Sequence, residues 1–294
     1  MKPSKYSKTC SHGPERNQRL MNYFYGKNVF LTGGSSGIGL ATAELLATNG
    51  YTVFAASRNP PDEIRSFPGG GEIRPVTLDV RDFESVGITA SSVLALSDIG
   101  IVIHCAGIGI ACAGEDYPLD AVGELMDTNY NGVLSVNSHF LPHLRKRGLG
   151  LCIITGSLAG MLPIPYQSHY CASKAALDLY STALRMEMRD YNVRVCLLMP
   201  GDTKTRFTNA RKYVISETSP HYEACKRAVS IMEKDEQGGC PPEAAARIIQ
   251  RLISVKNPPA RKIVGIGYKL LMLLRRLLPY KLTEFILRSI YMRR

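Results

Sequence analysis

The chain has 294 residues, a length that is ordinary for one large α/β domain. Hydrophobic residues make up 45% of it and charged residues 21%, which excludes global disorder and allows a sizeable buried core. The net charge of +11 is concentrated at the two ends, because residues 1–20 and 261–294 are strongly basic and the segment between them is nearly neutral. Proteins that bind nucleic acid more often carry basic residues across the body of the fold, so we expect no nucleic-acid partner.

Eight cysteines occur without a CxxC pair or a metal-binding spacing, and several lie inside apolar runs, such as Cys152 and Cys196. This pattern indicates buried free thiols in a reducing compartment and no metal site. Residues 1–20 are polar and basic, which predicts a disordered leader rather than a signal peptide. No window of 18 uncharged apolar residues exists, so we expect no membrane span and a cytoplasmic location.

From Asn28 onward, short apolar runs alternate with longer stretches of helical pattern. The apolar runs predict strands at 28–32, 51–57, 73–77, 99–104, 151–155, 193–199 and 261–265. Helices are expected at 37–49, 81–96, 118–146, 167–190, 221–234 and 241–254, with a loop at 202–220. The strand runs are continuously apolar, as strands buried on both faces are. The pattern therefore predicts an α/β fold, a doubly wound parallel sheet of about seven strands with helices on both faces.

A glycine-rich segment follows the first expected strand and leads directly into a helix; it reads Thr32-Gly33-Gly34-Ser35-Ser36-Gly37-Ile38-Gly39. Glycines allow a tight turn and a close approach of the backbone to a pyrophosphate, and the helix N-terminus offers free N–H groups. An ordinary strand–turn–helix connection is the alternative. The strand before and the helix after favour a dinucleotide site in a Rossmann-type fold.

The end of the second expected strand bears on the choice of cofactor. A dinucleotide-binding domain specific for NAD(H) usually places a carboxylate there, which holds the ribose 2′-hydroxyl. Here the strand ends in Ser57-Arg58 with no carboxylate, and a guanidinium attracts a 2′-phosphate. The sequence therefore favours NADP(H) over NAD(H), with a solvated surface charge as the other interpretation of Arg58.

Three further residues predict acid–base chemistry at the same edge of the sheet. Ser157 follows the fifth expected strand, and Tyr170 and Lys174 lie four residues apart on one face of the next helix. A tyrosine titrates near pH 10, so it is a poor acid–base group near neutrality unless a neighbouring ammonium stabilises the phenolate. The combination, downstream of a dinucleotide loop, indicates reaction at a carbonyl or alcohol.

With these motifs the sequence resembles the short-chain dehydrogenase/reductase family over residues 26–265. The resemblance implies a catalytic tetrad of Asn129, Ser157, Tyr170 and Lys174, in which Tyr170 exchanges the proton and Ser157 steadies the oxyanion. Lys174 would hold the nicotinamide ribose and lower the pKa of Tyr170, and Asn129 would kink its helix. The implied cofactor contacts are Thr32, Gly33, Ser35, Ser36, Gly37, Ile38, Gly39, Ser57, Arg58, Asp79, Val80, Cys105, Ala106, Gly107, Tyr170, Lys174, Pro200, Gly201, Thr203 and Thr205.

One motif departs from the family pattern. The family's Asn-Asn-Ala-Gly after the fourth strand reads His104-Cys105-Ala106-Gly107 here. We expect His104 to be a buried structural residue in place of an amide, with a general base as the weaker alternative.

The expected domain organisation places one Rossmann-type NADP(H)-binding catalytic domain at 21–265, with a substrate lobe at 201–235, and an amphipathic basic helical extension at 266–294. Leucines of the extension gather on one side of a helical wheel, with Met272 as the apolar exception and Pro279 as an interruption. Packing against the protein's own core or a partner subunit is one interpretation. Peripheral contact with an anionic membrane, over an apolar substrate, is the other.

The resemblance is weaker at the level of substrate and favours the hydroxysteroid and retinol branch. The predicted function is NADP(H)-dependent interconversion of a ketone or aldehyde and an alcohol on a steroid, retinoid or other lipid-like molecule. A reductase of 3-oxoacyl or other small carbonyls, or a non-catalytic dinucleotide-sensing scaffold, is the alternative. The family commonly forms homodimers or homotetramers, which we also expect here.

Overall fold

The computed structural model describes residues 24–292, so the expected leader at 1–20 lies outside the described residues. Its main sheet has the strand order β10-β8-β7-β5-β1-β2-β4-β3. Seven of these strands are parallel, as predicted: β1 (Asn28–Thr32), β2 (Thr52–Ser57), β4 (Glu72–Thr77), β5 (Ile101–His104), β7 (Gly150–Thr155), β8 (Val193–Met199) and β10 (Arg261–Ile263). The eighth, β3 (Arg65–Ser66), is an exposed antiparallel edge strand that the sequence analysis missed.

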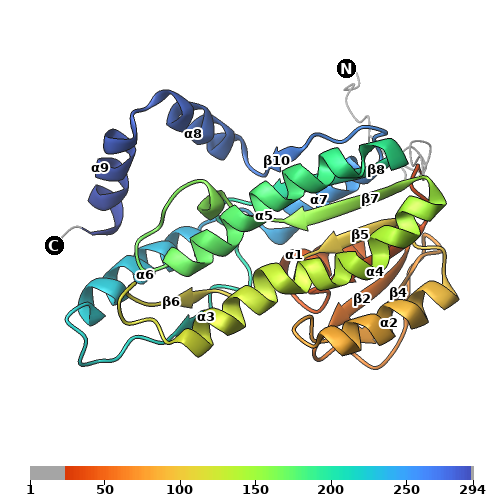
Figure 1. Cartoon of the computed structure of the whole chain (residues 1–294), viewed down its shortest axis with the longest axis horizontal. Helices are drawn as coiled ribbons and strands as arrows, with labels where there is room; N and C mark the ends of the chain where they lie inside the picture. The colour runs from red at the N-terminus through yellow and green to blue at the C-terminus, as the bar shows by residue number, and fades with distance from the viewer. Residues whose placement is uncertain (1–23, 293–294) are drawn as a thin grey trace, which may run out of the picture.

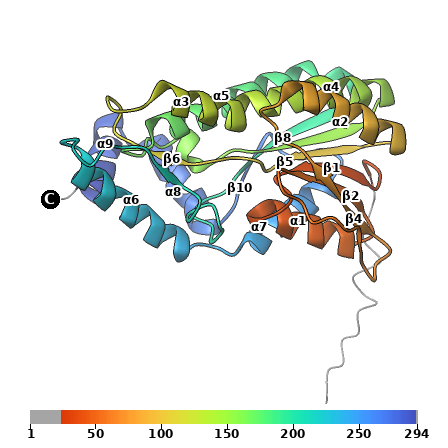
Figure 2. The same cartoon turned by 90° about the horizontal axis from the view of Figure 1, so that it is seen from below.

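Helices cover both faces of the sheet (Figures 1 and 2). One layer holds α1 (Gly37–Thr48) and α7 (Pro242–Ile253); the other holds α2 (Phe83–Leu96), α4 (Gly132–Arg147) and α5 (Ser168–Glu187). Successive side chains of a strand point to opposite faces, so Val29 and Leu31 join the first layer and Phe30 the second. Helices cover both faces of the sheet, which explains why the strands are continuously apolar.

The helix predicted at 118–146 contains a change in its winding. It begins as α3 (Leu119–Met126), passes through a π-helical turn at Asp127–Asn131 and continues as α4. A π-helical turn inserts an extra residue into the helical ladder and re-aims the side chains within it. Asn129 lies in this turn and is fully buried.

A smaller lobe extends beyond the carboxyl edge of the sheet. The segment predicted as a loop at 202–220 contains β9 (Lys212–Tyr213), which pairs in parallel with β6 (Ile110–Ala111). α6 (Tyr222–Gln237) packs on this pair through a separate apolar cluster that includes Cys225 and Met232. The lobe therefore has a core of its own, to which the expected substrate segment 201–235 and residues at β6, Ala111 to Ala113, both contribute.

The chain ends in two helices that stand away from the sheet (Figure 1). They are α8 (Ile266–Leu277) and α9 (Tyr280–Tyr291), separated at Pro279. Among the described residues, no helix is long and apolar enough to cross a membrane.

Candidate active site

A cavity of about 690 Å³ lies at the carboxyl edge of the sheet, between the sheet, the lobe and the terminal helices. In open α/β sheets this edge is where ligands bind. All but two of the residues predicted for catalysis or cofactor binding line it. The exceptions are Thr32, whose hydroxyl accepts from the N–H of Ala106 behind the loop, and Asn129.

The glycine-rich loop has the geometry of a phosphate cradle. Gly33 and Gly37 adopt positive φ angles of 75° and 53°, which side chains rarely tolerate. A Cβ atom on Gly33 would lie 2.6 Å from the backbone nitrogen of Ala106, so the loop can only close against β5 without a side chain. Ser36, at the N-cap of α1, makes no capping bond, and the first turn of α1 contains no acid. The first N–H groups of α1 are therefore available to an anion.

The far end of the cavity also fits the adenosine half of a dinucleotide. The hydroxyl of Ser57, at the end of β2, is buried and has no hydrogen-bond partner in the described structure. Such an orphaned group calls for a ligand or a water molecule. Arg58 lines the same end of the cavity, as predicted. The loop, the orphaned hydroxyl and the guanidinium together fit a nicotinamide dinucleotide.

Asp79 is engaged by a residue that the sequence analysis missed. Arg81 forms a two-pronged ion pair with Asp79, and its remaining nitrogen donates to Glu124 at 3.0 Å. Hydrogen bonding by Arg81 is the main reason that the pKa of Asp79 lies below its usual value, and Arg58 adds to this effect. Two guanidinium groups thus lie near the adenosine end of the cavity.

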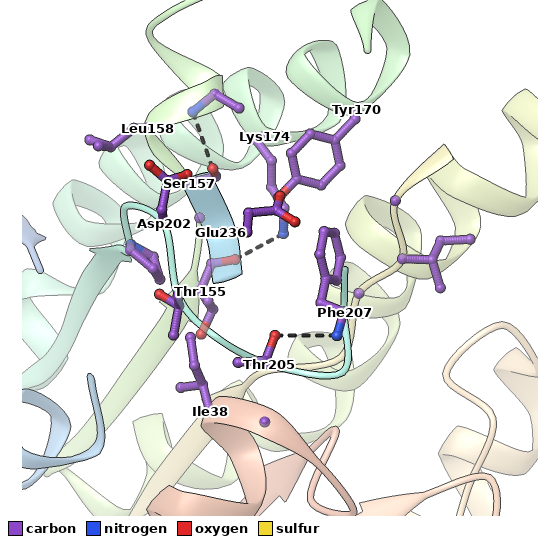
Figure 3. Close-up of a pocket in the computed structure, with 18 of the residues that line it drawn as sticks. Ile38, Thr155, Ser157, Leu158, Tyr170, Lys174, Asp202, Thr205, Phe207 and Glu236 are labelled. Carbon is purple, nitrogen blue, oxygen red and sulfur yellow. Dashed lines mark hydrogen bonds between the residues drawn. The ribbon is translucent and has the colours of Figure 1, made fainter. Parts of the chain in front are cut away.

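The three predicted acid–base residues meet at the other end of the cavity (Figure 3). Ser157 follows β7, and its Oγ accepts from the N–H of Ala159 at 3.1 Å, which fixes the serine at the start of a short 3₁₀ turn. Tyr170 and Lys174 project from α5, one turn apart. The Nζ of Lys174 donates to the carbonyl of Thr155 at 3.1 Å and lies 5.8 Å from the ring centre of Tyr170.

Burial is the main cause of the pKa shifts of Tyr170 and Lys174. It raises the pKa of Tyr170 to about 12, although hydrogen bonding by Ser157 opposes the shift. It lowers the pKa of Lys174 to about 8, because the buried site disfavours the charged ammonium. The lowering of the Tyr170 pKa by Lys174 stays a prediction; in the structure the largest cause of the shift is burial, which raises this pKa. A tyrosine with this pKa stays protonated at neutral pH, so the proton is present, but its donation needs a group that stabilises the phenolate.

Asn129 supports the site from behind. Its Oδ1 accepts from the N–H of Ile108 at 2.8 Å, and its Nδ2 donates to the carbonyl of Ile108 and to Ser173. The segment after β5 and helix α5 are therefore held together through one buried amide. The π-helical turn is what points this amide inward.

His104 has the structural role that we expected. It is 2% exposed, and its Nε2 lies 2.9 Å from Oδ1 of Asn137. The amide nitrogen of Asn137 donates to Tyr180, so its oxygen faces the imidazole and Nε2 carries the hydrogen. Burial lowers the pKa of His104 to about 4, which keeps it neutral.

The lobe contributes residues that no sequence pattern pointed to. Phe207 lies against Tyr170 with ring centres 5.8 Å apart, and the carboxylate of Glu236 reaches the same part of the cavity (Figure 3). Glu236 is held by the hydroxyl of Thr208 at 2.6 Å and by the buried guanidinium of Arg211. Its charge adds to the raised pKa of Tyr170, and that of Arg211 opposes it.

The terminal helices close the remaining side of the cavity with apolar residues: Leu271, Leu274 and Leu278 around α8, and Ile286, Leu287 and Ile290 on α9. The hydroxyl of Tyr268 donates to Asp202, which ties α8 to the loop after β8. Among the described residues, no cluster of His, Cys, Asp or Glu could hold a metal ion.

A parallel sheet with a dinucleotide cradle and a Ser–Tyr–Lys group at its carboxyl edge defines a nicotinamide-dependent oxidoreductase. The short chain dehydrogenase family model matches residues 27–213, and the chain belongs to this family.

Individual relatives agree with this placement. The chain is 34% identical to a 3-ketodihydrosphingosine reductase of Bacteroides thetaiotaomicron over 81% of its own length and 87% of the relative's. It is 27% identical to human 17-beta-hydroxysteroid dehydrogenase type 1, over 79% and 76% of the two chains. A solved short-chain dehydrogenase of Streptomyces avermitilis matches with a TM-score of 0.73 and 27% identity, over 85% and 92%. The protein is thus an oxidoreductase of this family, with relatives that include hydroxysteroid dehydrogenases.

Proposed function

We propose that this protein interconverts a ketone or aldehyde and an alcohol on an apolar, lipid-like substrate, with NADP(H) as the cofactor. The observation that carries the proposal is the composition of one cavity. The phosphate cradle and the Ser157–Tyr170–Lys174 group line one side of it, and leucines and isoleucines of α8 and α9 line the other. In a substrate with a carbonyl group on an apolar skeleton, the carbonyl would contact the catalytic side of the cavity and the skeleton the apolar side.

In the direction of reduction, Tyr170 donates its proton to the carbonyl oxygen, and Ser157 donates a hydrogen bond to the oxygen as negative charge develops there. The bound nicotinamide supplies the hydride. Lys174 would hold the ribose hydroxyls of the cofactor and, as an ammonium, would stabilise the phenolate that remains. Asn129 is a positioning residue that holds α5 and the segment after β5 in register. Alcohol oxidation uses the same groups in reverse.

Two features support NADP(H). β2 ends without a carboxylate, and Arg58 lines the same cavity as Ser57, whose buried hydroxyl has no hydrogen-bond partner in the described structure. A 2′-phosphate would accept from both groups, whereas a 2′-hydroxyl gains less from a guanidinium.

The lining of the cavity and the named relatives support the substrate class. Leu158, Leu162, Ile164 and Phe207 add to the apolar side formed by the terminal helices. The two relatives described above are named for a keto substrate, 3-ketodihydrosphingosine, and for a 17-beta-hydroxysteroid. A small, polar carbonyl compound would leave much of this surface uncovered.

The proposal is tested by NADPH oxidation, with NADH in parallel, against 3-ketodihydrosphingosine, ketosteroids, retinal and 3-oxoacyl thioesters. Turnover of one of the first three with NADPH is expected. Tyr170→Phe should bind NADPH and lose at least about 100-fold in turnover. Tyr191→Phe, which changes an exposed tyrosine outside the cavity, should behave as the unmodified protein.

Unchanged turnover in Tyr170→Phe contradicts the role given to this residue. Turnover of 3-oxoacyl thioesters alone favours the small-carbonyl alternative. Tight NADPH binding without turnover of any of these compounds favours a dinucleotide-sensing scaffold.

A further inference from the structure

One set of apolar side chains on the C-terminal helices is exposed rather than packed on the body of the protein. On α8, Leu270, Leu273 and Leu277 expose 58%, 56% and 73% of their surface. On α9, Phe285 exposes 67%, and exposed apolar side chains accompany it: Leu282, Ile286 and Ile290. Exposed apolar side chains that gather on adjoining helices in this way are typical of interaction surfaces on soluble proteins. We call this set of seven side chains the α8–α9 face.

The attachment of α8 to the body uses a different side of the helix. Met272, which lies off the leucine stripe, is 8% exposed and joins the main core cluster, and Tyr268 packs beside it. Tyr268 also bonds to Asp202. Leu270, Leu273 and Leu277 therefore face away from the core, because another side of α8 meets it.

The α8–α9 face borders the active-site cavity. Leu271 and Leu274 on α8, and Ile286 and Ile290 on α9, line the cavity while each remains at least 39% exposed. The same two helices thus contact the cavity and the outside with apolar side chains.

The two helices that carry this apolar face are strongly basic. The two helices carry five Lys or Arg side chains, Lys269, Arg275, Arg276, Lys281 and Arg288, against a single acid, Glu284. Within residues 24–292, none of the five forms an ion pair. Two copies of the chain joined through this face would bring like charges together, since a two-fold interface apposes the same patch. An anionic surface complements the charges instead.

We propose that the α8–α9 face docks on an anionic lipid bilayer, with both helices lying in the interface and the cavity opening toward the lipid. Each helix has 12 residues, which is shorter than the roughly 20 that span a bilayer. Apolar side chains on one side and cations around them are the features of an interfacial helix. Docking on the bilayer is independent of the substrate of the enzyme. Entry of the substrate from the lipid rests on the proposed function.

The chain contains no tryptophan, so one introduced residue gives an unambiguous fluorescence signal. In Phe285→Trp, vesicles of phosphatidylcholine with phosphatidylglycerol should shift emission to the blue, and brominated acyl chains should quench it. Vesicles of phosphatidylcholine alone should give a much weaker response, and added salt should reduce the response to anionic vesicles. Phe83→Trp, an exposed position on α2, is the matched control and should not respond.

Sedimentation of the full chain with anionic vesicles tests the apolar contribution. Leu273→Ser with Leu277→Ser changes two face residues that do not line the cavity, and should weaken partitioning about tenfold or more. Leu96→Ser with Leu119→Ser removes two leucines that are also exposed, but outside the face, and should leave partitioning unchanged.

Equal sedimentation of the two double variants, or no response of Phe285→Trp to anionic vesicles, overturns the proposal. A dimer that Leu273→Ser with Leu277→Ser dissociates, without vesicle binding by the unmodified chain, also overturns it and assigns the face to a second copy. Turnover of a substrate dispersed in water is also measured for Leu273→Ser with Leu277→Ser. If this variant turns over the substrate but does not bind vesicles, docking has been lost while the proposed reaction is intact.

Discussion

The hydroxyl of Tyr268 donates a hydrogen bond to a carboxylate oxygen of Asp202 and thereby joins the first turn of α8 to the loop that follows β8. The ring of Tyr268 also covers Gly201, where a Cβ atom would lie 2.3 Å from it. Burial and the neighbouring carboxylate both raise the pKa of this phenol, so it remains a donor at neutral pH. The terminal helices are thus attached directly to a loop that we predict to contact the nicotinamide.

Tyr268→Phe should loosen α8 without removing an apolar contact. A hydrogen bond to a charged, partly exposed group contributes on the order of 1 kcal/mol, so we expect trypsin to cleave at Lys269, Arg275 and Arg276 roughly fivefold faster. Tyr213→Phe is the matched control, because the hydroxyl of Tyr213 also donates to a carboxylate, that of Glu233, away from α8. Equal cleavage rates in the two variants contradict a tethering role.

The activity in the direction of reduction should depend on pH through Lys174. Its pKa is about 8, so the ammonium is present below this pH and is lost as the pH rises through it. Tyr170, with a pKa of about 12, remains protonated throughout. Initial rates of NADPH oxidation should therefore give a kcat/KM that is level below pH 7 and falls above pH 8. A constant kcat/KM up to pH 10 contradicts the role proposed for Lys174.

Arg58 should decide between the two nicotinamide cofactors. Arg58→Ala removes the guanidinium that directly follows β2 and that we expect to contact a 2′-phosphate, so the KM for NADPH should rise about tenfold or more. The KM for NADH should change little. Arg65→Ala, which removes an exposed arginine paired with Glu44, should affect neither cofactor. An unchanged KM for NADPH in Arg58→Ala assigns this arginine to the solvated surface.

The parallel strands could be predicted because strands buried on both faces consist of continuous apolar residues. β3, β6 and β9 have two residues each, which is too short for a hydrophobic pattern to be recognised. Their pairing depends on which segments the fold brings together.

The same limit applies to the prediction of active-site residues. Ser157, Tyr170 and Lys174 form a local pattern, whereas Glu236 and Phe207 reach the cavity only because the lobe folds over it.

The C-terminal helices illustrate a second limit. Periodicity identified an amphipathic extension and its interruption at Pro279, but it does not say what covers the apolar face. A protein core and a lipid bilayer both accept leucine. Met272, which lies off the stripe, turned out to be the anchor of α8. The side of a helix that meets the core is decided by attachment points such as Tyr268, and no hydrophobic pattern records these.

His104 should make the stability of the fold depend on pH in a window below neutrality. Its pKa is about 4 in the folded protein and about 6.5 when unfolded, so the unfolded chain binds the extra proton between these values. Stability from this residue is therefore complete above pH 6.5 and is lost as the pH falls toward 4. The pKa difference corresponds to roughly 3 kcal/mol over the whole window.

His104→Asn places the family's usual residue at this position and removes the titrating group. The free energy of unfolding, from urea titrations at pH 7.5, 6, 5 and 4.5, should fall less steeply for the variant than for the unmodified protein. His139→Asn is the control, because it removes an exposed imidazole on α4 rather than a buried one on a strand. Parallel curves for His104→Asn and the unmodified protein would mean that the pKa of His104 is the same in the folded and the unfolded protein. An imidazolium would then form below about pH 6.5 inside a core where the Oδ1 of Asn137 is its hydrogen-bond partner.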